Sequence, residues 1–193
     1  VSRRIYDIYF KNLKTGKVIS QTISNSTGSV AWANDNKTVF YTSKNQTTLL
    51  GEKIWRHKVG EKSNDKLMYH EKDDTFYNGV YKSKSGKFII IYHSSTLISD
   101  YQILNADNPD GTFKRFTPRD FNHEYSIDHF DDKFYIITNW KAENNRLMET
   151  SDQKTSISNW KEVISHRKDV HLLSMEIFTN HLVISERKNG LRE

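Results

Sequence analysis

Apolar and polar residues alternate along the chain with a period of two. Segments 29–32, 38–42 and 133–137 are short and rich in aromatic and β-branched residues, and polar turns such as 34–36 and 84–86 separate segments of this kind. This pattern is typical of β-strands. No segment keeps an amphipathic helical stripe over about ten residues. The pattern therefore predicts an all-β fold.

The strands recur at a longer interval, with four strands in each repeat. The second strands begin at Val39, Phe88, Phe134 and Leu182, which are 49, 46 and 48 residues apart. A period in the high forties with four strands per unit is typical of β-propeller blades. The second strands are nearly continuously apolar, so we expect them to be buried on both faces. The repeat predicts a partial β-propeller, about four blades' worth of four-stranded antiparallel sheets.

The repeat begins and ends in the middle of a unit. Strands at 6–10 and 18–21 are predicted to be the third and fourth strands of one blade, and 30–32 the first strand of the next. We predict a single propeller fragment over 1–193. It begins with the second half of a blade at 1–25, continues with three blades at 29–70, 76–117 and 124–165, and ends with the first half of a blade at 171–193.

Two arrangements fit a repeat that begins and ends in the middle of a blade. The two half-blades could meet and close a four-bladed ring, or the chain could be an open arc cut from a larger propeller. An open arc exposes the faces of its end blades and unpaired strand edges. We therefore expect self-association through those ends.

Composition narrows the class of protein. The mean hydropathy is −0.78, but 12 % aromatic residues argue against disorder. The chain has no Cys, which excludes disulfides, thiolate metal sites and Cys nucleophiles. This composition fits a reducing compartment, so we expect a cytoplasmic location, with the periplasm as the alternative.

Two classes of partner are not indicated. The longest apolar run, 88–92, is far shorter than the roughly twenty residues of a membrane span, and the basic start of the chain is not followed by the apolar stretch of a signal peptide. The net charge of +5 is mild and its signs are interspersed. We expect neither membrane insertion nor nucleic-acid binding.

Glycine spacing excludes several catalytic motifs. No two glycines are closer than seven positions. This excludes G-x-S-x-G, the nucleophile elbow of α/β-hydrolases, as well as G-x-G-x-x-G and the phosphate loop. We therefore predict no catalytic residue in this chain and assign no substrate-binding residue. The glycines are Gly16, Gly28, Gly51, Gly60, Gly79, Gly86, Gly111 and Gly190.

The densest group of potential metal ligands lies at 123–129. In a strand, His123 and His129 share a face but lie about 20 Å apart, and Glu124 and Asp128 on the other face lie about 13 Å apart. One ion cannot bridge either pair. We predict no metal site and no cofactor.

Other candidate functional residues can be interpreted either as structural or as ligand-binding. Glu71-Lys72-Asp73-Asp74 is interpreted as a solvated loop between blades, with an acidic patch for a basic ligand as the alternative. Trp32 and Trp55 are predicted to lie in blade cores. Ligand stacking is the alternative for these two and for Trp140 and Trp160. The glycosylation sequons at Asn25, Asn36 and Asn45 are interpreted as chance matches.

Several strings resemble a known family. They keep their order and spacing across nearly all of the 193 residues, and they stand at 30–35, 54–60, 71–77, 123–129, 133–135, 160–164 and 185–191. The chain resembles the prolyl oligopeptidase family of serine peptidases, and within it the oligopeptidase B (protease II) branch.

The resemblance implies a parent protein of two domains. A seven-bladed propeller would cap a C-terminal α/β-hydrolase domain with a Ser-Asp-His triad, which would cleave short peptides after Arg or Lys. The propeller would narrow access, so that folded proteins are excluded. This chain would correspond to propeller blades only, as an open arc, with the hydrolase domain and short basic peptides as partners. The alternatives are a stand-alone propeller-like binding scaffold and a basic, aromatic-rich nucleic-acid binder.

Overall fold

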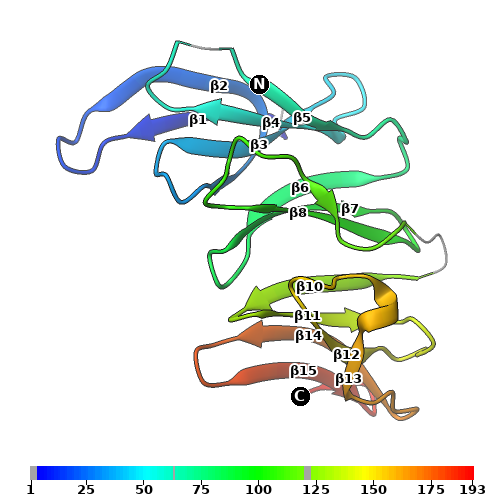
Figure 1. Cartoon of the computed structure of the whole chain (residues 1–193). Helices are drawn as coiled ribbons and strands as arrows, with labels where there is room; N and C mark the ends of the chain where they lie inside the picture. The colour runs from blue at the N-terminus through cyan, green and yellow to red at the C-terminus, as the bar shows by residue number, and fades with distance from the viewer. Residues whose placement is uncertain (1–3, 63, 120–122) are drawn as a thin grey trace. The chain divides into compact units, whose positions relative to one another are not determined.

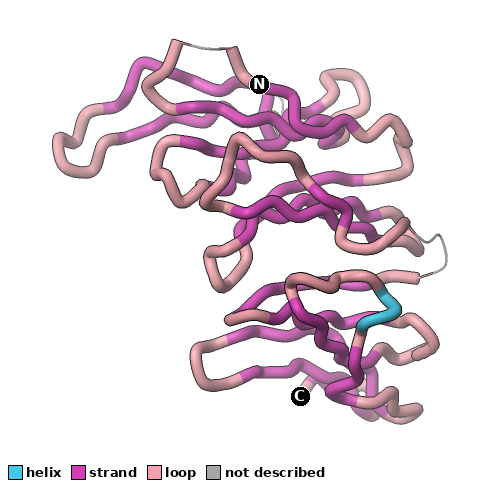
Figure 2. Tube along the Cα trace, viewed as in Figure 1, coloured by secondary structure: helices cyan, strands magenta, loops and turns pink. Residues whose placement is uncertain are grey.

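Strands make up nearly all the regular structure. The computed structural model describes residues 4–62, 64–119 and 123–193. Within these ranges the single helical element is one 3-10 turn, η1 (Ile157–Asn159), and the strands form four sheets (Figure 2). The predicted all-β fold is confirmed. No helix in the described ranges is long and apolar enough to cross a membrane.

In every sheet the strands follow one another in sequence order, as in a meander (Figure 1). The first sheet contains β1 (Tyr6–Lys11), β2 (Val18–Trp32), β3 (Thr38–Lys44), β4 (Gly51–Lys58) and β5 (Lys66–His70). The second contains β6 (Tyr77–Lys82), β7 (Phe88–Ser94), β8 (Ser99–Asn105) and β9 (Lys114–Arg115). The third contains β10 (Tyr125–Phe130), β11 (Lys133–Thr138), β12 (Arg146–Ser151) and β13 (Lys161–Ile164). The fourth contains β14 (Val170–Ile177), β15 (Leu182–Lys188) and β16 (Leu191–Arg192).

Strand β2 is a correction to the sequence analysis. The predicted strands at 18–21 and 30–32 form one continuous strand of 15 residues. Its first half pairs with β1 and its second half pairs with β3, and the register shifts between Ser26 and Val30. The shift is a bulge that contains Gly28 (φ 89°), and a second irregularity, in the pairing of β2 with β1 between Ile23 and Ser26, contains Asn25 (φ 61°). The bulge lets one strand serve two pairings that the hydrophobic pattern separates.

The chain divides into two compact units. One contains Val1–Lys82, Gly86–Ser95 and Gln102–Lys114, and the other contains Ser83–Ser85, Thr96–Tyr101 and Arg115–Glu193. In the first unit, side chains of the first two sheets form one core, in which Phe40 meets Phe113 edge to face at 5.6 Å between ring centroids. The buried members of this core are Ala31, Ala33, Phe40, Ile54, Val80, Ile89, Ile91, Leu104, Ala106 and Phe113.

Of the four second strands, β3 and β7 are buried along consecutive residues, as their apolar runs predicted. The prediction is wrong for β15, which has no buried residue, and β11 is buried along consecutive residues only at 136–138. Residues 38–42 of β3 and 88–91 of β7 are all buried. Because successive side chains of a strand point to opposite faces, both faces of these strands are covered. The β1–β2 hairpin packs Phe10 and Ile23 against Val39 and Tyr41.

The second unit has its own cores. Ile137 and Leu147 of the third sheet pack against Leu172 of the fourth. An aromatic cluster is also buried here, in which Phe116 lies 4.9 Å from Phe134 and 6.3 Å from Trp160 between ring centroids. These contacts hold the strand ends that carry the site described below.

Replacing Gly28 by alanine is expected to lower the free energy of unfolding by about 1–2 kcal/mol. The residue has a φ of 89°, which alanine disfavours, and an added Cβ would lie 3.3 Å from the Tyr6 ring. Urea unfolding of the chain followed by tryptophan fluorescence measures the change. The adjacent, exposed Ser29→Ala is the control and should change stability by less than about 0.5 kcal/mol. Equal effects of the two substitutions would argue against the bulge as the cause.

Candidate functional site

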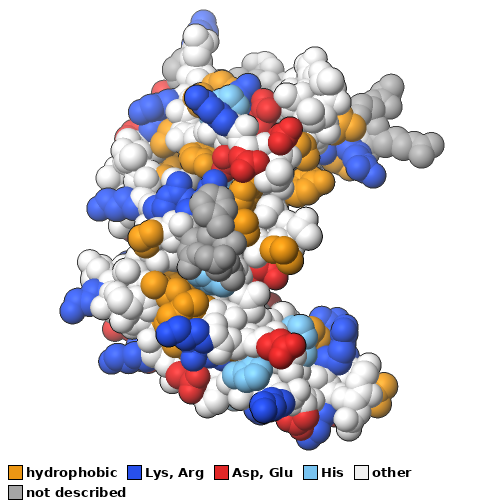
Figure 3. All heavy atoms as spheres, turned by 90° about the vertical axis from the view of Figure 1, so that its right-hand side faces the viewer, with side chains coloured by type: hydrophobic (Ala, Val, Ile, Leu, Met, Phe, Trp, Pro, Cys, Tyr) orange, Lys and Arg blue, Asp and Glu red, His pale blue; other side chains and the backbone are white. Residues whose placement is uncertain are grey.

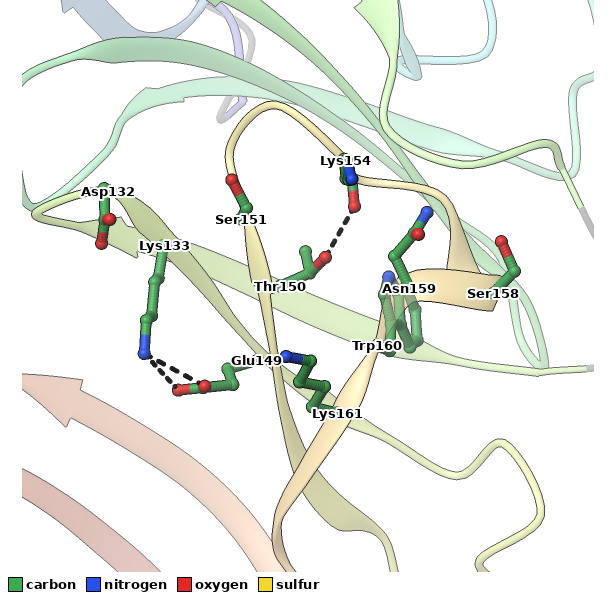
Figure 4. Close-up of a pocket in the computed structure, with 10 residues that line it drawn as sticks. All are labelled: Asp132, Lys133, Glu149, Thr150, Ser151, Lys154, Ser158, Asn159, Trp160 and Lys161. Carbon is green, nitrogen blue, oxygen red and sulfur yellow. Dashed lines mark hydrogen bonds and ion pairs between the residues drawn. The ribbon is translucent and has the colours of Figure 1, made fainter.

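A pocket of about 600 Å³ lies at one end of the third sheet (Figure 4). Strands β11 and β13 begin and β12 ends at this edge, and two loops complete the walls. A volume of this size suits a small ligand. The lining residues are Asp132, Lys133, Glu149, Thr150, Ser151, Lys154, Ser158, Asn159, Trp160 and Lys161.

Strand register places three charged side chains on one face of this sheet. Glu149 pairs across the ladder with Lys161, and Lys133 lies one diagonal step away on β11. The Lys133 Nζ donates to both carboxylate oxygens of Glu149, at 3.1 and 3.2 Å. These hydrogen bonds raise the pKa of Lys133. Lys161 is exposed and forms no ion pair with the described residues.

Three hydrogen bonds hold the connection between β12 and β13, which forms another wall of the pocket. The Thr150 hydroxyl donates to the Lys154 carbonyl at 2.6 Å, and the Lys154 amide donates to the Ser151 carbonyl at 3.0 Å, which fixes the turn after β12. The indole Nε1 of Trp160 donates to the Thr155 carbonyl at 2.9 Å. Thr150 and Trp160 are only 4 % and 8 % exposed, so buried side chains hold this connection from both of its ends.

Figure 4 shows Lys154, Ser158 and Asn159 around one part of the pocket and the Lys133–Glu149 ion pair at another. The lining contains cations, hydroxyls and an amide, which are groups that can form ion pairs and hydrogen bonds with a polar ligand. On the face of the molecule in Figure 3, acidic and basic side chains are interspersed, as the sequence indicated.

The histidines of 123–129 serve packing and internal hydrogen bonds. His123 lies 5.3 Å from Tyr125 and 6.3 Å from Trp160 between ring centroids. His129 is fully buried, and its Nδ1 lies 2.7 Å from the Ser85 hydroxyl. Asp128 accepts the backbone N–H of Lys84, but burial dominates and raises its pKa. The described ranges contain no group of three or more His, Asp or Glu side chains arranged to hold a metal ion.

The acidic segment 71–74 is partly internal. Glu71 is only 8 % exposed, accepts the Tyr69 hydroxyl at 2.8 Å and lies 3.9 Å from Nδ1 of the fully buried His93. Asp73 caps its own turn through the amide and the hydroxyl of Thr75. The interpretation as a fully solvated loop is therefore wrong for Glu71, whose carboxylate belongs to a buried network.

The four tryptophans differ in their surroundings. Trp55 is half-buried in the core beneath the β1–β2 hairpin and donates to the Ser43 hydroxyl at 2.8 Å. Trp32 was predicted to be in a blade core, but it is 38 % exposed at the end of β2 and touches Phe10 edge to face. Trp140 lies under two cations, with Lys141 Nζ 4.6 Å and Arg146 Cζ 4.9 Å from its centroid.

Two sequon asparagines have structural roles. The Asn25 amide donates to the Lys44 carbonyl at 2.8 Å. The Asn45 side chain accepts the backbone N–H groups of Thr47 and Thr48 with its Oδ1, at 2.9 and 3.0 Å, and its Nδ2 donates to the Glu52 carboxylate at 3.1 Å. A glycan on either amide would compete with these contacts. Asn36 has a φ of 54° in the turn before β3.

A buried carboxylate with two arginines was missed by the sequence analysis. Asp100 is fully buried, and its Oδ2 accepts both Arg119 Nε, at 3.0 Å, and Arg115 Nη1. Its Oδ1 accepts the Tyr101 amide at 2.9 Å. Burial raises the pKa of the nearby Tyr125. The residues lie 15 and 19 positions apart, and no short motif connects them.

Comparison with known proteins gives a match over the whole chain. Residues 1–193 match the family described as prolyl oligopeptidase, N-terminal beta-propeller domain. Dipeptidyl aminopeptidase BI of Pseudoxanthomonas mexicana is 38 % identical over 98 % of the chain, and Protease 2 of Moraxella lacunata is 32 % identical over 97 %. The chain spans 26 % and 27 % of the length of these two relatives, about a quarter in each case.

Solved structures give the same result. Oligopeptidase B from Leishmania major superposes with a TM-score of 0.89 at 27 % identity, over 98 % of this chain and 27 % of that one. Oligopeptidase B from Trypanosoma brucei gives a TM-score of 0.85 at 27 % identity, over 98 % and 26 % of the two chains. In these comparisons too, the similarity covers a propeller portion of a much longer chain.

Proposed function

Since this chain belongs to the prolyl oligopeptidase family, as part of its N-terminal β-propeller domain, we propose that it is the non-catalytic gating portion of a serine oligopeptidase. In this role the stacked sheets narrow the route to a catalytic domain, so that short peptides enter and folded proteins do not. The observation that carries the proposal is the match of the family's propeller domain to residues 1–193.

The catalytic domain is the proposed partner. The glycine spacing lacks the G-x-S-x-G elbow that an α/β-hydrolase nucleophile needs. The two relatives are about four times as long as the stretch that this chain matches. Both observations support a parent whose α/β-hydrolase domain lies in the remaining length.

Cleavage after Arg or Lys is the proposed specificity of the parent. The support is the similarity to two oligopeptidase B structures and to Protease 2. The name of the dipeptidyl aminopeptidase relative indicates that members of the family release different products, so specificity needs a direct measurement.

The absence of Cys supports a cytoplasmic parent. The exposed Tyr6 and Tyr9 on edge strand β1 support self-association.

The purified chain is expected not to hydrolyse fluorogenic peptides that end in Arg, whereas the complete reading frame of the parent is expected to cleave them. A fluorescence assay with and without a serine-reactive inhibitor measures both. Inhibitor-sensitive turnover by the chain alone would contradict a non-catalytic role. A reading frame that stops soon after Glu193 would favour the stand-alone scaffold.

A second comparison tests gating. The parent should cleave a short Arg-containing peptide and leave the same sequence uncut in a loop of a folded protein. Similar cleavage rates for the two substrates would show that the propeller does not select by size.

A further inference from the structure

We propose that the pocket at the end of the third sheet binds the C-terminal carboxylate of a short peptide. The preference for a carboxylate follows from the lining of the pocket. The choice of a peptide as its carrier rests on the proposed function, because the parent would handle short peptides. The binding groups are Lys154 and Lys161, supported by Ser158 and Asn159.

The lining carries three lysines and two carboxylates, Asp132 and Glu149, so its charge is positive overall. Lys133 donates to both oxygens of Glu149, so these two charges largely compensate each other. Lys154 and Lys161 are exposed and form no ion pair with the residues that the structure describes. In Figure 4, Lys154 lies beside Ser158 and Asn159, and Lys161 lies beside Glu149. A carboxylate that binds next to Lys154 would gain favourable Coulomb energy on entry, and Lys161 would add attraction from a greater distance.

Neutral donors lie beside Lys154. In Figure 4, Ser158 and Asn159 lie on the same side of the pocket as Lys154. The Ser158 hydroxyl and the Asn159 side-chain amide each form only one hydrogen bond with another described residue. Both bonds go to Ser156 and are long, at 3.4 Å. They can therefore exchange these weak contacts for hydrogen bonds to a carboxylate.

The walls are in place before a ligand arrives. The hydrogen bonds from Thr150 to the Lys154 carbonyl and from Trp160 to the Thr155 carbonyl fix the connection between β12 and β13. A preformed site avoids part of the entropy cost of ordering loops on binding.

The same lining disfavours a phosphate. Asp132 and Glu149 lie among the lining residues and would repel a dianion more strongly than a monoanion. The cations are lysines, without the planar fork with which arginine grips phosphate in two-point contacts. Asp132 can instead accept an N–H from the peptide that carries the carboxylate.

Titration of the ¹⁵N-labelled chain with N-acetyl-dialanine tests the proposal. The free acid should shift the amide signals of the loops at 151–161, and the matched C-terminal amide should not. Higher salt should weaken the interaction because the lysines are exposed to solvent. Equal shifts by acid and amide, or no shifts by either, would overturn the proposal whatever the catalytic properties of the parent.

Three substitutions locate the site. Lys154→Gln and Lys161→Gln are each expected to weaken binding by about three- to fivefold. Glu149→Gln should strengthen it, because Lys133 is then released toward the ligand. Lys14→Gln, in the exposed turn between β1 and β2, is the control and should leave binding unchanged. The spectrum of each variant also shows whether its fold is intact.

Two further outcomes would count against the proposal. If Lys14→Gln weakens binding as much as Lys161→Gln, attraction is diffuse and no site exists. If inorganic phosphate displaces N-acetyl-dialanine at equal or lower concentration, the pocket is a general anion site and the commitment to a peptide carboxylate is wrong.

Discussion

Asp100→Asn is expected to lower the free energy of unfolding by about 3–5 kcal/mol. The carboxylate is fully buried, and one of its oxygens accepts hydrogen bonds from both Arg115 and Arg119. The amide keeps the volume but removes the negative charge that Asp100 places against the guanidinium of Arg119, whose side chain is only 17 % exposed. Urea unfolding near pH 7 measures the loss.

Asp110→Asn is the matched control. Asp110 also faces two cations, with Arg56 at 2.6 Å and Lys58 at 3.4 Å, but its side chain is 60 % exposed. Ion pairs in contact with solvent contribute little, so this substitution should cost less than about 1 kcal/mol. A loss at Asp100 as small as the loss at Asp110 would mean that the ion pairs of this buried carboxylate do not stabilise the second unit.

Phe40→Ala should destabilise the first unit by about 3–5 kcal/mol. The side chain is fully buried in the core that the first two sheets share, and its ring meets Phe113 edge to face. Truncation removes this aromatic contact and leaves a cavity that β3 and β7 cannot fill without distortion, because both strands are buried along consecutive residues. Urea unfolding gives the total loss, and hydrogen exchange of the β7 amides shows whether the second sheet is loosened.

Tyr9→Ala is the control for this truncation. It removes an aromatic ring of similar size from a position that is 64 % exposed, so its effect should stay below about 0.5 kcal/mol. If β7 keeps full protection in Phe40→Ala, the two sheets do not share a cooperative core.

Much of the fold could be predicted because the order of apolar and polar residues within a strand indicates which of its faces are buried. The apolar runs at 38–42 and 88–91 are the most buried strands of the first two sheets. The turn residues and the spacing of the second strands predicted the four-stranded sheets β6–β9 and β10–β13. The continuity of β2 could not be predicted in this way, because it depends on positive φ values at Asn25 and Gly28 and not on hydrophobic alternation.

Single side chains were harder to predict than strands. Trp32 is apolar and lies in a strand, but its exposure depends on whether another element covers the end of β2. Glu71 is charged and lies beside three other charged residues, yet Tyr69 and its own backbone neighbours satisfy its carboxylate. In both positions tertiary contacts decide the environment, and the local sequence does not contain them.

The pocket was not visible in the sequence because its parts are brought together by strand register. Lys133, Glu149 and Lys161 are spread over 29 positions and share a face only through the pairing of β11, β12 and β13. A sequence signal exists in the alternation of these strands, but it becomes specific only when the register is known. The exclusion of hydrolase motifs from the glycine spacing needed no such information.

The bulge in β2 also affects how length changes in the chain can be accommodated. Between Ser26 and Val30 the strand advances four residues while its partner β3 moves only from Ser43 to Tyr41. In an ordinary strand, a one-residue insertion turns every later side chain to the wrong face. Here the irregular stretch can absorb such a change, so insertions and deletions among relatives should gather at 27–29. The β1–β2 hairpin can then vary in length while the core beneath β3 keeps its register.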